Sequence, residues 1–301
     1  VIGVLKDLNG VASANLHLQK GGSSKEIILP MFALNDSTYE VSIHDSLVTI
    51  NNFRAYVRGV DNLDNTGNSK SFYPSIIYGA NELNTNIDGS IYPDGVPSKK
   101  WRMISFPGSV NDSIINNAKG KGFTFYVWNN LEMSWDFPST IKPGNAYWFK
   151  HIYDEPFPFK SDSGLVFALK PYEIKLDQGW NMIGNPFASS VNVNVDSSEV
   201  SGLYFFGDSL NRDGWEVSSY QMRPWAGYAI YANSESSSIT LLPFSDQIES
   251  RSSSRTMGLE WMIQFSAIAQ NNFDNVVMIG RKKHSLDVRD SFDLPLLPKI
   301  D

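Results

Sequence analysis

The sequence predicts an all-β protein, and two of its features support that prediction. Apolar runs of about four to eight residues, rich in β-branched and aromatic side chains, recur along the chain. Between them lie many residues that favour turns, including 22 glycines and 15 prolines. Only residues 112–119 (DSIINNAK), with Asp112 at the N-cap position, have the pattern of a short helix.

The pattern of strands and turns in residues 1–95 predicts a β-sandwich. We expect strands within 17–22, 40–43, 48–50 and 54–57, with turn residues between them. In the stretch 53–58 the charged residues Arg54 and Arg58 fall on one face of the strand. Strands at a spacing of about 8–12 residues are typical of an immunoglobulin-like or fibronectin type III-like sandwich.

Two segments of this unit are similar to the immunoglobulin-like modules of large secreted bacterial proteins: HLQKGG (17–22) and YEVSIHDSLVTINNFRAYVRGVDNLDNTGN (39–68). Those modules run from a strand ending in a Gly-Gly turn to a hairpin rich in Asp and Asn. His44 and Asp45 stand here where proline is usual, and Gly59 stands where alanine is usual. The first strand looks clipped, so we expect the chain to be part of a longer protein.

The middle of the chain contains an internal repeat. Residues 101–107 (WRMISFP) match 180–186 (WNMIGNP) at an offset of 79, and 143–149 (PGNAYWF) match 224–230 (PWAGYAI) at an offset of 81. Tyr126 and Trp135 match Tyr204 and Trp215 at similar offsets. Two copies are too few for a solenoid, so we expect one pseudo-symmetric β domain at 96–244, with repeats 96–170 and 171–244.

The same block resembles a tandem motif, W-x-M-I-S-x-P…P-G-x-A-Y-W followed by G-W-N-M-I-G-N-P-F, over residues 100–187. That motif occurs near the C-terminal ends of secreted multidomain bacterial surface proteins, many of them exported by a type IX-like secretion route. The resemblance implies an extracellular or cell-surface location. It also implies an accessory region, often behind hydrolase domains, whose biochemistry is unassigned.

The polar, Ser-rich composition of residues 245–256 (SDQIESRSSSRT) predicts a linker, and the pattern of residues 257–301 predicts a C-terminal β extension. We expect strands at 261–267 and 274–281 in this extension. It resembles the start of another β-sandwich of the same surface proteins, so we expect a partial sandwich here.

Composition and charge exclude several classes of protein. The chain has 25 basic and 32 acidic residues and a net charge of −7, which argues against a nucleic-acid partner. No run approaches the roughly 18 apolar residues of a membrane-spanning helix. Cysteine is absent, which removes disulfides and thiolate chemistry.

Motifs for catalysis are also missing from the sequence. It contains neither a G-x-S-x-G nucleophile elbow nor a P-loop. The histidines His17, His44, His151 and His284 lie in separate segments, and none has a second ligand at metal-site spacing. Two carboxylates for glycoside hydrolysis are possible in principle, but nothing marks a pair. We therefore expect a protein that is not an enzyme and that has no cofactor, with calcium as the one alternative.

Oxygen-rich loops are the candidates for calcium binding, because such loops hold Ca²⁺ in extracellular modules. The same residues also form ordinary turns by bonding to their own backbone, and that alternative stays open. The first candidate loop contains Asp61, Asp64, Asn65 and Asn68, and the second contains Asp208, Asn211 and Asp213.

Tryptophans are the candidates for sugar binding, because flat indole faces stack on sugar rings. Most of them recur at equivalent positions of the two repeats, as buried core residues would. Trp135 and Trp225 are the preferred candidates, since Trp225 falls at a turn where the first repeat has Gly144 or Asn145.

The sequence thus predicts a non-catalytic structural or adhesive segment of a secreted or surface protein, such as a spacer, a filament or surface-layer component, or a docking module. Its expected partners are other protein subunits, including copies of itself joined through exposed strand edges. The alternative is an accessory region of a secreted hydrolase that binds polysaccharide.

Overall fold

The computed structural model describes residues 1–111, 122–196, 198–209, 212–244, 246, 259–269 and 272–282. These residues form antiparallel β-sheets, which confirms the all-β prediction. Within the described ranges no helix is long and apolar enough to span a bilayer. The expected helix at 112–119 and nearly all of the linker 245–256 lie outside the described residues.

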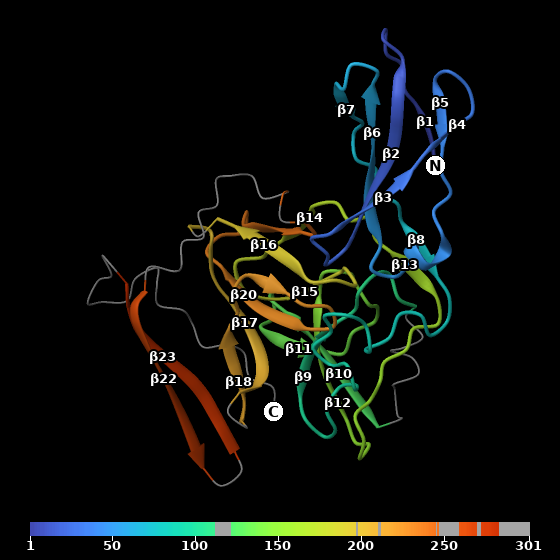
Figure 1. Ribbon diagram of the computed structural model, residues 1–301. Coiled ribbons are helices and arrows are strands. Elements are labelled where there is room, and N and C mark those ends of the chain that lie inside the picture. The colour runs from blue at the N-terminus through green and yellow to red at the C-terminus, as the bar shows by residue number, and fades with distance from the viewer. Residues whose placement is uncertain are drawn as a thin grey trace.

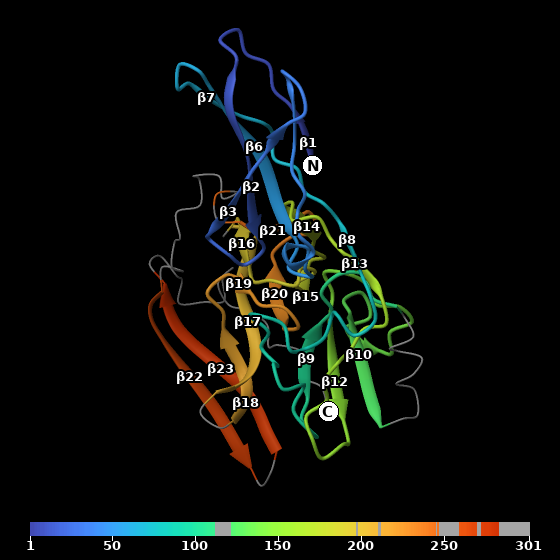
Figure 2. The ribbon, with the colours of Figure 1, turned by 45° about the vertical axis from the view of Figure 1, so that its right-hand side comes forward.

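Residues 1–72 form a β-sandwich that stands at one end of the molecule (Figures 1 and 2). One sheet has the strand order β1-β5-β4 and the other has the order β3-β2-β6-β7. The strands are β1 (Ile2–Val4), β2 (Val11–Lys20), β3 (Glu26–Pro30), β4 (Phe32–Ala33), β5 (Thr38–Glu40), β6 (Phe53–Asp61) and β7 (Thr66–Asn68).

The core of this sandwich follows from the alternation of side chains along its strands. Leu16 and Leu18 of β2 and Ala55 of β6 are fully buried, and they face Met31 and Tyr39. Each buried aliphatic side chain contributes about 1.5–3 kcal/mol to folding. The intervening residues of β2 lie on the opposite face of the sheet.

Of the strands expected in this unit, the one at 48–50 is absent and the one at 40–43 is present only at its start. β5 ends at Glu40, and the stretch 41–50 contains the short 3-10 helix η1 (Asp45–Leu47). The ring of His44 accepts a hydrogen bond from the Ser46 N–H, and the Val48 N–H donates to the Asp45 carbonyl. These local bonds compete with strand pairing and turn the chain instead.

The central unit contains two four-stranded sheets with the same arrangement. The first has the order β11-β10-β12-β9, and the second has the order β18-β17-β20-β15. The first sheet consists of β9 (Arg102–Ser105), β10 (Phe123–Asn129), β11 (Ser134–Asp136) and β12 (Ala146–His151). The second consists of β15 (Gly179–Gly184), β17 (Val200–Ser209), β18 (Arg212–Val217) and β20 (Gly227–Ala232).

Equivalent hydrogen bonds join these two sheets. The Ser105 N–H donates to the Trp225 carbonyl at 3.1 Å, and the Gly184 N–H donates to the Gly144 carbonyl at 2.8 Å. The same offsets of 79 and 81 residues relate the members of the two bonds. Each sheet therefore makes the same contact to the other.

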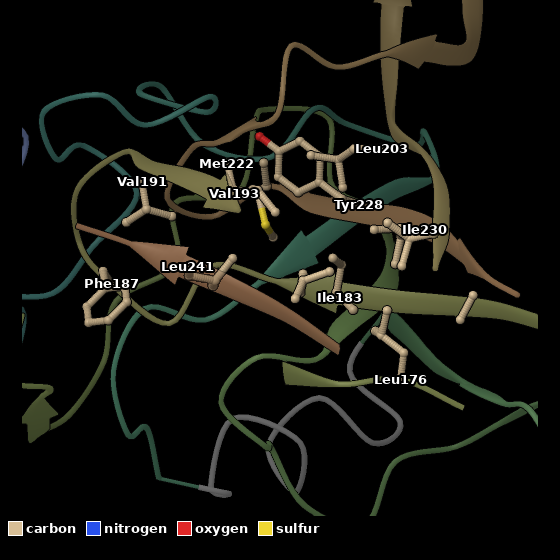
Figure 3. Close-up of a cluster of buried hydrophobic side chains, with 14 of the residues drawn as sticks. Leu176, Ile183, Phe187, Val191, Val193, Leu203, Met222, Tyr228, Ile230 and Leu241 are labelled. Atoms are coloured by element: carbon tan, nitrogen blue, oxygen red, sulfur yellow. The ribbon is translucent and has the colours of Figure 1, made fainter. Parts of the chain in front are cut away.

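Two apolar layers cover the two faces of the second sheet. A mainly aromatic layer, which includes Trp148, Trp180 and Trp215, lies between the two sheets. Side chains of β15, β17 and β20 pack on a third sheet of order β14-β21-β16-β19 (Figure 3). That sheet consists of β14 (Tyr172–Lys175), β16 (Val191–Val195), β19 (Gln221–Met222) and β21 (Ser238–Leu242).

The segment 76–96 belongs to the central unit, although the sequence placed the end of the sandwich at 95. β8 (Ile76–Tyr78) pairs with β13 (Gly164–Val166), and Leu83 and Val96 are fully buried in the core on the outer side of the first sheet. The contacts that hold this segment come from residues far along the chain, so its own sequence does not reveal them.

The C-terminal part of the described chain is a hairpin of β22 (Leu259–Ala269) and β23 (Asn272–Lys282). Both strands were expected from the sequence. In Figures 1 and 2 the hairpin runs beside β18.

Candidate functional site

The histidines of the described chain have structural partners. His17 Nδ1 lies 3.0 Å from a Glu26 carboxylate oxygen, and His151 Nε2 lies 2.9 Å from the Val96 carbonyl oxygen. His44 caps η1, and His284 lies outside the described residues. Over the described ranges, no three residues among His, Asp and Glu gather as metal ligands would.

The carboxylate of Asp61 forms the turn between β6 and β7. Its Oδ1 accepts hydrogen bonds from the N–H groups of Leu63 and Asn65 at 2.8 and 2.7 Å, and its Oδ2 accepts one from the Asn65 side chain at 2.8 Å. These bonds, the Asn65 side-chain bond above all, lower the pKa of Asp61 below its usual range. The Asp61 carboxylate therefore stabilises the turn.

The other members of this loop have separate places. Asp64 has the left-handed backbone of a turn residue, with a φ of 65°. Asn68 is exposed on β7, opposite Arg58. Calcium binding by Asp61, Asp64, Asn65 and Asn68 stays a prediction. In the second loop, Asn211 and the side chains of Asp208 and Asp213 lie outside what the structure describes.

Trp225 is a core residue, so its assignment as a sugar-stacking residue was wrong. It is 0% exposed, its ring stacks on Phe159 with centroids 5.8 Å apart, and its Nε1–H donates to the Asn84 carbonyl at 2.9 Å. Its φ of 67° is rare for a bulky residue, and Gly144 has a φ of 83° at the matching position. The backbone turn is shared by both sites, but at Trp225 the side chain enters the core beside the first sheet.

Trp135 lies at the edge of the aromatic layer and is partly exposed. It stands opposite Trp128 in the β10–β11 pair, with ring centroids 4.8 Å apart, and its ring meets the edge of the buried Trp148 at 6.2 Å. The indole of Trp128 donates to the Asn130 side chain at 3.3 Å. Of the two predicted sugar-binding residues, only Trp135 has part of its side chain open to a ligand.

The sandwich has an open groove that the sequence analysis did not predict. It has a volume of about 550 Å³ and lies between β1 of one sheet and β6–β7 of the other. Leu5, Val11, Val57 and Phe72 supply its apolar side chains. Gly3, Gly59 and Gly67 also line it.

Of these glycines, Gly67 is the one that faces open space. A Cβ on Gly59 would collide with Leu5, which shows that this face of β6 points toward β1. Gly67 pairs with Gly59 across β6–β7, so it shares that face. Among the described residues, no atom beyond its chain neighbours lies within 4 Å of a Cβ placed on Gly67. Isolated glycines inside strands were the signal that sequence reasoning passed over.

Both strands that flank the groove are sheet edges in the described chain. Val1 and Val41 exchange backbone hydrogen bonds at 2.8 and 3.0 Å, so by antiparallel alternation the backbone groups of Ile2 and Val4 point away from β5. On β7 the Ser69 N–H donates to the Val57 carbonyl at 2.8 Å. The N–H and C=O groups of Thr66 and Asn68 therefore point away from β6.

Comparison of the chain with protein-family models, with curated proteins and with solved structures gives no match.

Proposed function

We propose that this chain is a non-catalytic structural or adhesive segment of an extracellular or cell-surface bacterial protein. The observation that carries the proposal is the junction between the sandwich and the central unit. Neighbouring domains usually move relative to each other unless their contact is extensive. Here the contact includes two hydrogen bonds from one fully buried side-chain amide, and such bonds favour a fixed orientation of the two units, which suits a segment that transmits position or force.

Asn52 is the centre of this junction. It is 0% exposed, and its side-chain amide donates to the carbonyls of Pro74 and Phe167 at 2.8 and 2.9 Å. Its carbonyl oxygen accepts from the Phe53 N–H at 2.7 Å. One residue of the sandwich thereby bonds both the connecting segment, at Pro74, and the central unit, at Phe167.

Arg54 and Gly21 extend the junction on either side. The Arg54 guanidinium lies over the Phe244 ring at 4.2 Å and forms an ion pair with Asp246 at 2.7 Å. Gly21 packs so closely that a Cβ there would lie 2.8 Å from the Ser189 hydroxyl. The same Cβ would lie even closer to the Asn51 carbonyl oxygen within the sandwich, so position 21 accepts no side chain without a shift of its surroundings.

Calorimetry of the Asn52→Gly variant tests the stiffness of this junction. Glycine keeps the backbone φ of 54° at Asn52 and removes only the side-chain bonds. We expect one cooperative transition for the wild type, and in the variant a separate sandwich transition lowered by about 5 °C or more. Asn81→Gly is the matched control, because Asn81 is exposed and has a φ of 66°. Two separate transitions in the wild type would contradict the proposal.

The location is tested on the native protein. Antibodies raised against the sandwich should label intact source cells or detect the protein in the culture medium. A signal that appears only after the cells are opened would overturn the extracellular assignment. Support for this location comes from the sequence resemblances to secreted surface proteins.

We also propose that the two four-stranded sheets are copies of one duplicated unit. Their shared strand order and the equivalent inter-sheet bonds of Ser105 and Gly184 support this interpretation. In the first sheet Trp128 lies opposite Trp135, and in the second Phe206 lies opposite Trp215.

Polysaccharide binding is the second candidate function, and the partly exposed Trp128–Trp135 pair favours it. Quenching of tryptophan fluorescence by soluble glycans, reduced by Trp135→Ala and retained in Phe137→Ala, would support it. Phe137 is the control because it is an exposed aromatic residue just past β11. No quenching across a broad glycan panel would rule it out.

A further inference from the structure

We propose that the groove of the sandwich binds an extended peptide segment of a partner protein, which adds as a strand to the free edge of β7. This inference deepens the proposed function, because it names where a structural segment of this kind would join its partner. Strand addition combines backbone hydrogen bonds at a sheet edge with side-chain pockets at alternate positions. The groove offers both features.

The backbone of β7 supplies the hydrogen bonds. The N–H and C=O groups of Thr66 and Asn68 face away from β6, as the Ser69–Val57 bond fixes. Natural proteins usually protect such an edge with charged side chains, proline or a bulge. β7 has the sequence Thr-Gly-Asn, which contains no charged side chain and no proline, and its length of three residues limits the bonds that it can offer to those of Thr66 and Asn68.

The groove beside β7 supplies the pocket. Residues of an added strand alternate between the two faces of the sheet, so every second side chain would enter the space next to Gly67. That space is lined by Leu5, Val57 and Phe72, which favour aliphatic side chains. A volume of about 550 Å³ lies within the range of about 300–1,000 Å³ that is typical of ligand pockets.

The charged residues at one end of the groove indicate which charge the bound peptide has next to its apolar residues. Lys6, Asp7 and Asp61 line this end, which is one positive against two negative groups. Asp7 and Asp61 are connected through Asn9, whose N–H donates to Asp7 Oδ1 at 2.8 Å and whose side chain bonds Asp61. The segment that fits is therefore extended, aliphatic at alternate positions, and basic at the end beside Asp7.

The test uses a display library of short random peptides and the full chain. Selection is made on the wild type, with counter-selection on Gly67→Phe, in which the ring fills the groove. We expect enrichment of peptides with alternating aliphatic residues and a terminal Lys or Arg. Failure to enrich such a pattern overturns the proposal.

Fluorescence anisotropy with the most enriched peptide then locates the contact. Binding should weaken about tenfold or more in Gly67→Phe and in Asn68→Pro, which removes an outward N–H without touching the β6–β7 bonds. Gly67→Ala and Asn68→Ala are the matched controls and should bind like the wild type. Thermal melting of every variant is measured to check that it is folded.

Two results would contradict the inference. If the peptide no longer binds Gly67→Phe but binds Asn68→Pro as well as the wild type, the groove binds the peptide without adding it as a strand to β7. A concentration-dependent dimer that Gly67→Phe abolishes would make a second copy of this chain the occupant. Neither result affects the cell-surface location or the junction, so failure here is distinct from failure of the proposed function.

Discussion

Replacement of Trp225 by alanine is expected to destabilise the central unit by about 4 kcal/mol. Removing a fully buried Trp side chain costs about 3–5 kcal/mol, because the apolar contacts are lost and a cavity remains. Trp225 is 0% exposed and contacts Phe106 and Phe159, so the range for a fully buried residue applies and we take its middle value. The Asn84 carbonyl also loses the indole N–H that it accepts at 2.9 Å.

A second variant separates packing from hydrogen bonding at this position. Trp225→Phe keeps most of the apolar contact and the backbone conformation, but it leaves the Asn84 carbonyl without its donor. We expect a loss of about 1–3 kcal/mol for this change. Trp135→Ala is the matched control, since Trp135 is only partly buried and its loss should cost less than that of Trp225.

Urea unfolding followed by circular dichroism measures these differences, because the midpoint and slope give the free energy of unfolding. If Trp225→Ala lowers the free energy of unfolding by less than about 1 kcal/mol, the assignment of Trp225 to the core is refuted. Such a result would return Trp225 to the set of residues available to a ligand.

Three further outcomes follow from packing and charge. Burial raises the pKa values of Tyr204 and Tyr228 to about 12, so these tyrosines ionise at lower pH in the unfolded chain than in the folded one. The free energy of unfolding should therefore fall as pH rises from about 10 to about 12. A urea midpoint that does not change over this pH range would contradict the prediction. Because the pKa of Asp61 is lowered in the folded protein, its carboxylate stabilises the turn above about pH 4, and this stabilisation is lost as pH falls through the pKa of the folded state. Amide hydrogen exchange at β7 should become faster at that low pH. Asp61→Asn should remove this pH dependence. Gly227→Ala would place a Cβ 2.7 Å from Ala146 Cβ and should cost about 1–3 kcal/mol in urea unfolding; a neutral effect would show that the sheets are farther apart.

The strands that the sequence predicted well are those with strong local patterns. β6 covers the strand expected at 54–57, and β9, β12 and β20 fall on the repeat motifs 101–107, 143–149 and 224–230, which contain continuous apolar and aromatic runs. Their burial on at least one face produces the pattern that sequence reasoning detects.

The features that were missed depend on distant residues. Trp225 looked like an exposed turn residue because its partners, Asn84 and Phe159, lie far from it in the sequence. One clue was available: a bulky residue at a position that holds glycine in the other repeat needs a tertiary contact to offset its backbone strain. The expected strand at 48–50 failed for a local reason, the capping of η1 by His44.

The groove was missed because it is defined by what two sheets leave open. Gly3, Gly59 and Gly67 belong to three different strands, and only the register of β6 with β7 brings the last two to one face. In the candidate site, the residue types were visible in the sequence but their common location was not.

The stiffness of the junction is the central claim, and a distance measurement tests it most directly. The chain has no cysteine, so spin labels attach only at cysteines introduced at exposed positions such as Asp36 in the sandwich and Ser139 in the central unit. Double electron–electron resonance should give one narrow distance distribution for the doubly labelled protein, and a broader one when Asn52→Gly is added. A broad or multimodal distribution without that substitution would mean that the two units move independently, and it would contradict the account.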